Sequence, residues 1–415
     1  MDDVAPSGRP SATPPPVTDR PAAVLFLAHD LDDPAVWRRV SMLERGGAQV
    51  EVAGFRRGDG PLPRPAILLG RTRNGKMADR LRAVARASLN SARVLGRLPR
   101  PDAIVARNLE MLAVASRLRR AWEGPPPRLV YEVLDIHRLM VGDGAKARLM
   151  RAAERRLAAR ADLVLTSSPG FVRHHFAPHG IGGRVRLVEN KVLLPDGATL
   201  PPAPPLPAGD AIGGPVVIGW FGILRCRWSL HALDALTRGA PGRYQVHLRG
   251  RPALDAVPDF HEVVGANPDL LFGGPYRPED LHAIYGAVAI TWMVDRYDAG
   301  ANSDWLLPNR LYEGGAEGRI PLALAGTEVA AELGRKGIGL VLPDAEPAAV
   351  AALLAPLDAG ALRALGEAVR LVPASAWVAS TEECRELLRD VLGASPEDAA
   401  RPRPRVEARL EVAAP

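Results

Sequence analysis

Short apolar runs and amphipathic stretches alternate along the chain from about residue 22 onward. Ala22–Ala28 is apolar throughout, as expected of a strand buried on both faces, and Ala35–Arg45 repeats its apolar residues at helical spacing. Gly46 and Gly47 end that helix, and Gln49–Phe55 is typical of a second strand. A strand, a helix and a strand in this order predict a parallel sheet.

The same alternation continues to about residue 188. It predicts strands at Asp102–Ala106, Arg128–Leu134, Asp162–Thr166 and Val185–Val188, and helices at Leu109–Trp122, Lys146–Arg160 and Gly170–Phe176. Leu193–Pro215 then contains many Pro and Gly residues and almost no charge. That composition is typical of a linker between domains.

A second alternating series begins at Val216–Phe221. It predicts strands at Gln245–Leu248, Leu270–Phe272, Ala287–Met293 and Ile320–Ala325, and helices at Leu230–Thr237, Pro278–Tyr285, Asn309–Gly315, Val329–Gly334, Pro347–Ala355, Ala361–Val369 and Ala376–Leu392. The fold class is therefore α/β, with two doubly wound parallel-sheet domains. Ligands of such folds bind beyond the carboxyl ends of the strands.

The composition shifts set the expected domain boundaries. We place the first domain at 21–195, the linker at 196–214 and the second domain at 215–375. Residues 376–394 form a C-terminal helix that either stays with the second domain or crosses back to the first. The Pro-rich ends, 1–20 and 395–415, are predicted to be disordered.

Composition and charge exclude several classes of protein. The chain has 415 residues, and no apolar run approaches the ~20 residues that span a bilayer. It lacks a signal-peptide pattern, and its two cysteines do not suggest a disulfide framework, so a cytoplasmic setting is expected. The net charge of +6 favours anionic partners. The few aromatic residues are not interleaved with the basic ones, which argues against nucleic acid.

Two common nucleotide-binding loops are missing from the sequence. The loop after the first strand, Ala28–Asp33, contains no glycine, so a dinucleotide-binding domain is disfavoured. No Gly-x-x-x-x-Gly-Lys-Ser/Thr loop occurs either. Cys and His residues show no metal-ligand spacing, and the adjacent His174 and His175 are interpreted as surface histidines. No metal or cofactor is therefore predicted.

The segment Asn302–Ala323 carries the most informative pattern: a loop, a short helix, a turn and a strand. Pro308 fits the first turn of the helix, whose free N–H groups can hold a diphosphate. Glu313 follows about one and a half turns later, where its carboxylate could accept hydrogen bonds from ribose hydroxyls. An ordinary α/β unit with solvent-facing charges is the alternative.

Pro308–Ala323 resembles the donor-site segment of retaining GT-B glycosyltransferases of family 4, in which Pro-Asn-Lys-Leu-Tyr/Phe-Glu is followed by a Gly-x-Pro turn. The most similar branch is the exopolysaccharide (succinoglycan-type) one. Four further segments resemble this branch in the expected order: Arg107–Leu112, Tyr131–His137, Val188–Val192 and Gly219–Arg225. The likeness runs from about Ala22 to about Leu392.

This resemblance implies a GT-B fold, in which two Rossmann-like domains face each other across a cleft. It also implies transfer of a sugar from a nucleotide-diphosphate sugar, with retention of anomeric configuration and without a metal. Glu313 matches the second Glu of the family's Glu-x7-Glu motif, but the first falls at Trp305, and the neighbouring Asp304 is a candidate substitute. The expected donor-binding residues are Gly222, Asp304, Pro308, Asn309, Arg310, Leu311 and Glu313.

The resemblance also implies two basic residues beside the donor diphosphate. Arg225 and Arg227 occupy that loop, although the family's second position, usually Lys, aligns with Trp228. Fixed guanidinium groups can stabilise the charge on a departing diphosphate, and both arginines are predicted to be catalytic. A solvated loop in an Arg-rich protein is the alternative.

Polar residues end several strands of the first domain. The resemblance puts acceptor-side or catalytic groups at the end of the strand near residue 134, where Asp135 and His137 are predicted to be catalytic. At the same rim, the candidate acceptor-binding residues are His29, Asp30, Asn108 and Glu110. Glu110 also lies at a helix start, where a carboxylate is favourable for electrostatic reasons alone.

Residues 71–100 carry nine basic residues and one acid, with apolar positions between them. This pattern is expected of peripheral docking on an anionic membrane, at the inner face of the plasma membrane, which would bring the site to a glycan or lipid-linked acceptor. A solvated helix is the alternative. Two other functions also remain open: a nucleotide-sugar epimerase of the same architecture, and an inactive scaffold that binds nucleotide sugars or glycans.

Overall fold

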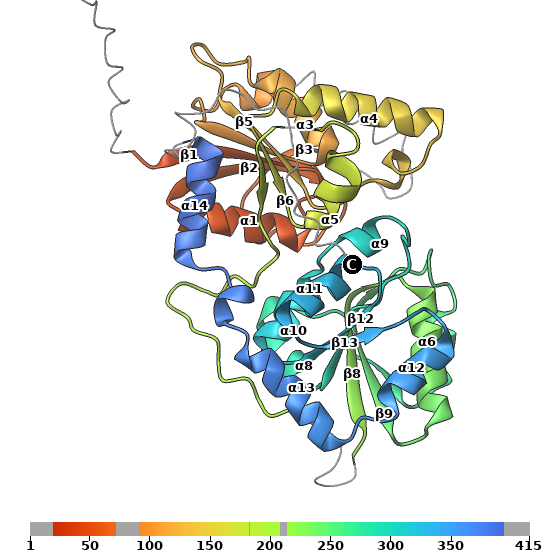
Figure 1. Ribbon diagram of the computed structural model, residues 1–415. Helices are drawn as coiled ribbons and strands as arrows, with labels where there is room; N and C mark the ends of the chain where they lie inside the picture. The colour runs from red at the N-terminus through yellow and green to blue at the C-terminus, as the bar shows by residue number, and fades with distance from the viewer. Residues whose placement is uncertain (1–19, 72–90, 182, 208–213, 394–415) are drawn as a thin grey trace, which may run out of the picture.

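The computed structural model describes residues 20–71, 91–181, 183–207 and 214–393 (Figure 1). The first sheet is parallel, in the order β3-β2-β1-β4-β5-β6-β7. Its strands are β1 (Ala22–Ala28), β2 (Ala48–Arg56), β3 (Ile67–Arg71), β4 (Ala103–Arg107), β5 (Arg128–Val133), β6 (Leu163–Thr166) and β7 (Val185–Leu187). Its helices are α1 (Pro34–Arg45), α3 (Asn108–Leu118), α4 (Ala145–Ala158) and α5 (Pro169–Phe171), which continues as a π-helix over Val172–Phe176.

The second sheet is also parallel, in the order β10-β9-β8-β11-β12-β13. Its strands are β8 (Val216–Leu224), β9 (Tyr244–Pro252), β10 (Leu270–Phe272), β11 (Ile290–Trp292), β12 (Ile320–Leu324) and β13 (Leu340–Leu342). Its helices are α6 (Arg227–Gly239), α7 (Phe260–Gly265), α8 (Leu281–Gly286), α9 (Asn302–Trp305), α10 (Asn309–Ala316), α11 (Glu328–Lys336), α12 (Pro347–Leu354) and α13 (Ala359–Leu371). Figure 1 shows the two α/β domains one above the other.

Two strands were not expected from the sequence pattern. β3 is a five-residue edge strand whose register with β2 shifts between Gly54 and Phe55, and it does not alternate cleanly. β13 is only three residues long and pairs with β12.

The expected helix Ala376–Leu392 is wrong in its first part. A short 3-10 turn ends at Ala376, and Val378 then forms a parallel bridge with Val192. Helix α14 (Thr381–Leu392) begins only after Ser380, which forms a capping box with Glu383.

Helix α14 packs on the first domain, beside α1 (Figure 1). Its buried face, Cys384, Leu387 and Val391, belongs to the same apolar cluster as strand β1. The helices touch closely at Gly46, where a Cβ would lie 2.5 Å from the Cys384 carbonyl oxygen. The last described helix therefore packs on the domain that contains the first described strand.

Several expectations fall partly outside the described residues. These are the two chain ends, residues 72–90 of the basic stretch and 208–213 of the linker. Within the described part, no single helix is long and apolar enough to cross a membrane; α12 and α13 meet that test only as a pair bent by 96°.

Candidate active site between the two sheets

The carboxyl ends of both sheets meet at the boundary between the domains. β1, β4 and β5 are neighbours and parallel, so the residues that follow them share one edge of the first sheet. The Asn302 side chain exchanges hydrogen bonds with the Ile136 backbone, 2.9 Å to its N–H and 2.7 Å to its carbonyl oxygen. Arg138 pairs with Asp298 and donates to the Tyr297 carbonyl oxygen at 2.9 Å. Loops beyond β5 and β11 thus join the two domains.

Asp135 and Arg225 face each other across this boundary. The Arg225 guanidinium pairs with Asp295 at 2.9 Å and lies 5.0 Å from the centre of the Tyr297 ring. Asp135 is open to solvent, but protein around it removes enough water to raise the pKa of its carboxyl to about 6. Arg225 opposes that rise in pKa, whereas Asp298 adds to it. A carboxyl that titrates near neutrality, beside a fixed cation, is suited to proton transfer or to orienting a hydroxyl.

His137 begins the 3-10 turn Arg138–Met140 that follows β5. Its Nδ1 accepts a hydrogen bond from the Leu139 N–H at 3.1 Å. In the neutral ring the proton therefore sits on Nε2.

The acceptor-side candidates differ in how they are held. Asp30 is buried and pairs with Arg57 at 3.2 Å, and burial raises the pKa of its carboxyl against the opposing effect of Arg57. Glu110 lies in the first turn of α3. His29 is half-buried directly after β1.

Asn108 is the most unusual of these candidates. Its φ of 69° makes it the one non-glycine residue in the left-handed region within the described ranges. Its Oδ1 is buried and has no hydrogen-bond partner among the described residues. Backbone strain and an unsatisfied polar atom are both costly, and they concentrate where a ligand completes the structure.

The donor-side candidates centre on α10. Glu313 Oε2 accepts a hydrogen bond from the Tyr285 hydroxyl at 2.7 Å, and no partner within the described residues bonds its Oε1. Burial raises the pKa of the Glu313 carboxyl, while the Tyr285 hydrogen bond, Arg38 and Arg310 lower it. One carboxylate oxygen is thus held in place and the other can accept hydrogen bonds from a ligand.

Arg310 is bonded to the backbone of β8 and to the residue that follows β11. Its Nη1 and Nη2 donate to the carbonyl oxygens of Phe221 and Met293, at 3.3 and 3.1 Å. Its Nε is buried without a hydrogen-bond partner in the described part of the chain. Pro308 precedes the first turn of α10 as its N-cap, one residue earlier than expected, and Leu311 is buried in the core.

Sequence reasoning missed Arg38, a cation that the first domain contributes to this site. Its Nη2 donates to Asn190 at 2.9 Å and, across the boundary, to Asn309 at 3.1 Å. Burial lowers the pKa of its guanidinium to about 10, so it remains charged at neutral pH. Nothing in the sequence distinguishes it from the other arginines, although its partner Asn190 lies in the segment Val188–Val192 that carried part of the family resemblance.

Trp305 occupies the position of the first Glu in the family's motif, and here it packs between the domains. Trp305 stacks on the His174 ring with centroids 5.5 Å apart, and its carbonyl oxygen accepts a hydrogen bond from Ser168. Asp304 instead accepts from the Gly300 N–H at 2.6 Å, within its own loop. Trp305 therefore joins the domains, and the structure gives it a packing role in place of a carboxylate.

Arg227, Trp228 and Gly222 lie near the start of α6 and the end of β8. Arg227 is exposed and pairs with Asp259 at 2.9 Å. Trp228 packs on Trp292 inside the second domain, with ring centroids 6.2 Å apart. Gly222 has a φ of 109°. Of the two arginines, Arg225 is the one with charged partners from both domains.

No group of three or more His, Cys, Asp or Glu side chains that could hold a metal is found within the described ranges. Two parallel sheets whose carboxyl edges meet at the domain boundary, with basic side chains joining the two domains there, are the architecture of a GT-B glycosyltransferase.

Comparison with known proteins agrees with this class. Residues 33–191 match the family model described as a glycosyl transferase 4-like domain. The chain is 47% identical to the succinoglycan biosynthesis protein ExoL of Rhizobium meliloti (strain 1021) over 378 residues, covering 89% of this chain and 93% of that protein. The chain belongs to the family 4 (group 1) glycosyltransferases of the succinoglycan type, and the predicted family is confirmed.

Solved structures share the fold at low identity. Alr3699/HepE of Anabaena, in complex with UDP and glucose, superposes with a TM-score of 0.63 at 16% identity, over 90% of this chain and 99% of that one. The sucrose-phosphate synthase of Thermosynechococcus elongatus gives 0.65 at 16% identity, over 90% and 100%. The predicted GT-B fold is confirmed, and the chain is a glycosyltransferase of exopolysaccharide biosynthesis.

Proposed function

We propose that the chain transfers a sugar from a UDP-sugar, with UDP-glucose as the first candidate, to a glycan or lipid-linked glycan. The proposal rests on the Glu313 carboxylate, of which Oε2 accepts a hydrogen bond from Tyr285 and Oε1 has no partner within the described residues. Its free oxygen lies about one helical turn after the start of α10, whose N–H groups can hold a diphosphate. The complexes of HepE with UDP and with UDP-glucose support the choice of donor.

The diphosphate would lie between the start of α10 and Arg225. The N–H groups of Asn309 and Arg310 are at the positive end of that helix. As the bond from sugar to phosphate breaks, negative charge grows on the diphosphate. Arg225, already oriented by Asp295, would stabilise that charge without reorganising. Fixed cations would thus take the role that a metal has in other transferases, and we propose that the reaction needs none.

The acceptor hydroxyl would approach from the first domain. Asp135 and His137 lie beyond β5 on the side that faces Arg225, and Asn108 presents its unsatisfied amide oxygen beyond the neighbouring strand β4. These groups would orient the hydroxyl and accept or relay its proton. We further propose that anomeric configuration is retained, as the family resemblance implies. A lipid-linked acceptor would place the reaction at the inner face of the plasma membrane.

Acceptor-dependent release of UDP tests this function. Purified protein is incubated with UDP-glucose, with and without a lipid-linked glycan fraction, and UDP and sugar products are measured with and without EDTA. A transferase releases UDP and extends the glycan only when acceptor is present, and EDTA does not change the rate. Conversion of the donor to an epimer without acceptor would identify an epimerase. Donor binding without any turnover would identify a scaffold.

A further inference from the structure

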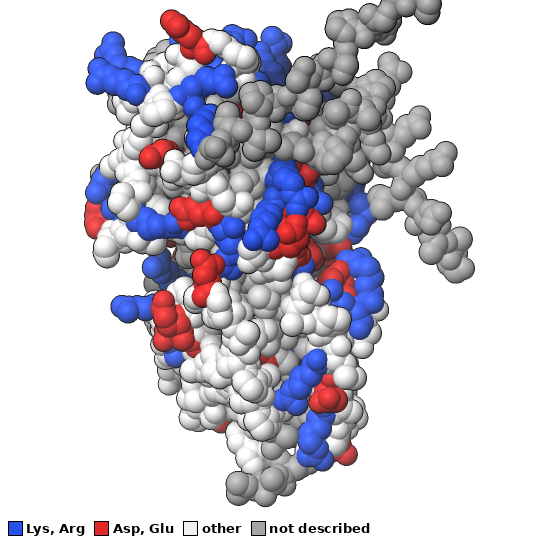
Figure 2. Space-filling view, turned by 90° about the vertical axis from the view of Figure 1, so that its left-hand side faces the viewer, with Lys and Arg blue, Asp and Glu red and all other residues white. Residues whose placement is uncertain are grey.

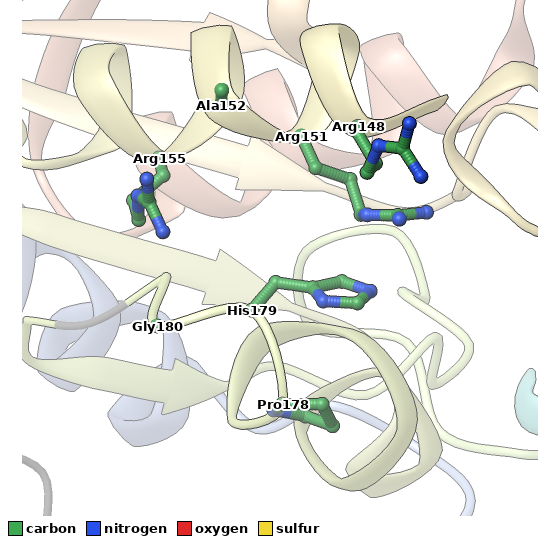
Figure 3. Close-up of a pocket in the computed structure, with 7 residues that line it drawn as sticks. All are labelled: Arg148, Arg151, Ala152, Arg155, Pro178, His179 and Gly180. Carbon is green, nitrogen blue, oxygen red and sulfur yellow. The ribbon is translucent and has the colours of Figure 1, made fainter. Parts of the chain in front are cut away.

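A second basic site lies in the first domain, away from the domain boundary. A half-open cavity of about 400 Å³ separates α4 from the segment that follows the π-helix (Figure 3). Arg148, Arg151 and Arg155 project into it from α4, and His179 lines the opposite wall. Figure 1 shows α4 on the side of the first domain that faces away from the second.

The three arginines have no acidic partner within the described residues. Arg148 donates to the carbonyl oxygen of Asp143 at 3.0 Å. Arg151 donates through Nη1 alone, to the carbonyl oxygens of Met140 at 2.8 Å and Gly142 at 2.6 Å. These hydrogen bonds orient the side chains without neutralising them, and they leave Nε and Nη2 of Arg151 for another acceptor.

The one acid on α4 bonds to other partners. Glu154 is fully buried on the inward side of the helix, where it bonds to the Tyr131 hydroxyl at 2.8 Å and to His175 Nε2 at 2.7 Å. His175 is itself buried, so its interpretation as a surface histidine is wrong: Glu154 draws it into the core. The helix carries five basic residues and this single acid. Its first turn is basic as well, which is the unfavourable sign for a helix N-terminus.

We propose that this cavity binds a phosphoryl group, as a phosphate or diphosphate, at a site separate from the proposed donor site. Guanidinium groups fork onto phosphate oxygens, and several on one helix face can surround a single anion. A bound anion would relieve the repulsion among three cations that form no ion pair with a carboxylate of the described residues. Three arginines line the cavity, and a single carboxylate would neutralise only one of them. The arrangement therefore fits an oxyanion with several negative charges better than a carboxylate.

The phosphoryl group could belong to a lipid headgroup or to a soluble molecule. Two exposed apolar side chains lie on α4 and in the 3-10 turn before it, although neither lines the cavity: Leu149 is 71% exposed and Leu139 38%. Exposed leucines on elements that also carry basic residues suit a membrane surface. The same chemistry would equally hold a soluble diphosphate, and the two sources are separated by experiment.

The test uses the full chain, saturated with UDP so that the proposed donor site is filled. Titration calorimetry with inorganic pyrophosphate and co-sedimentation with phosphatidylglycerol vesicles are compared for wild type, Arg155→Gln and the double variant Arg151→Gln/Arg155→Gln. Arg156→Gln is the control, since it removes the same charge from the same helix without lining the cavity. Arg155 makes no hydrogen bond to the neighbouring loop in the described residues, so Arg155→Gln is expected to fold normally.

The proposal predicts binding at least about tenfold weaker in the double variant, with Arg155→Gln intermediate and Arg156→Gln within about twofold of wild type. Parallel loss of pyrophosphate and vesicle binding, or loss of vesicle binding alone, identifies a headgroup. Loss of pyrophosphate binding alone identifies a soluble phosphoryl ligand. If wild type binds neither probe, or if the double variant binds both as well as Arg156→Gln does, the proposal is overturned. Unaltered UDP release in Arg155→Gln would keep this result separate from the proposed function.

Discussion

Replacing Glu313 by Gln should weaken nucleotide binding while leaving the shape of the site intact. In the free protein Oε2 accepts the Tyr285 hydroxyl at 2.7 Å, and Oε1 has no partner in the described residues. Hydrogen bonds to a charged group contribute about 1.5–3 kcal/mol each. Loss of one such bond to a ribose hydroxyl should therefore raise the Kd for UDP about ten- to a hundredfold.

The same substitution should stabilise the free protein at neutral pH. Burial raises the pKa of Glu313 in the folded state, so the folded chain holds this proton more tightly than the unfolded chain does. Stability from this group is therefore present at low pH and is lost as the pH rises through the two pKa values. A neutral Gln avoids that loss. The difference in unfolding free energy between Glu313→Gln and wild type should be largest above neutrality and shrink in acid.

Calorimetric titration with UDP and denaturant unfolding between pH 4 and 8 measure both effects. Glu367→Gln, an exposed acid on α13, is the matched control and should change neither quantity. The reasoning is refuted if Glu313→Gln binds UDP as tightly as wild type. It is also refuted if the variant is less stable than wild type at pH 8, because the carboxylate would then be stabilising the fold.

Four further substitutions test individual contacts of the two domains. If the reaction needs ionised Asp135, activity in a pH–rate profile should fall as the pH drops through about 6, and Asp135→Asn should remove this fall. Arg225→Gln removes a cation that lowers the Asp135 pKa, so in this variant the fall should occur at higher pH. Arg225→Gln should also lower kcat about 10²–10³-fold in steady-state assays, as loss of one transition-state donor does. Arg38→Gln should raise the KM for the donor about tenfold, since it loses its bond to Asn309. Gly315→Ala should lower the free energy of unfolding by about 1–3 kcal/mol, because a Cβ there lies 2.5 Å from the Trp377 ring.

The fold was largely predictable because buried parallel strands leave a strong apolar signal. β1 and β10 were predicted with the bounds that the structure gives. β13, with three residues, was not predicted. The last helix was predicted to start too early, because the bridge that holds Val378 in an extended conformation is made with Val192, which is distant in sequence. Tertiary contacts of that kind leave no local signal.

The candidate site was predictable only in part. Asp135 and Arg225 were candidates because the family resemblance puts polar and basic groups in the loops after these strands, and their roles stay predictions. Arg38 and Tyr285 could not, because each acts across a helix–helix or domain contact that no sequence pattern records. The left-handed backbone of Asn108 was likewise hidden, since asparagine occurs in many ordinary turns as well.

A crystal structure of the complex with UDP would show where the nucleotide binds. We predict that the diphosphate lies between Arg225 and the first turn of α10, with the ribose hydroxyls hydrogen-bonded to Glu313 Oε1. Density for UDP away from the domain boundary, with Glu313 bonded to Tyr285 alone, would contradict the account.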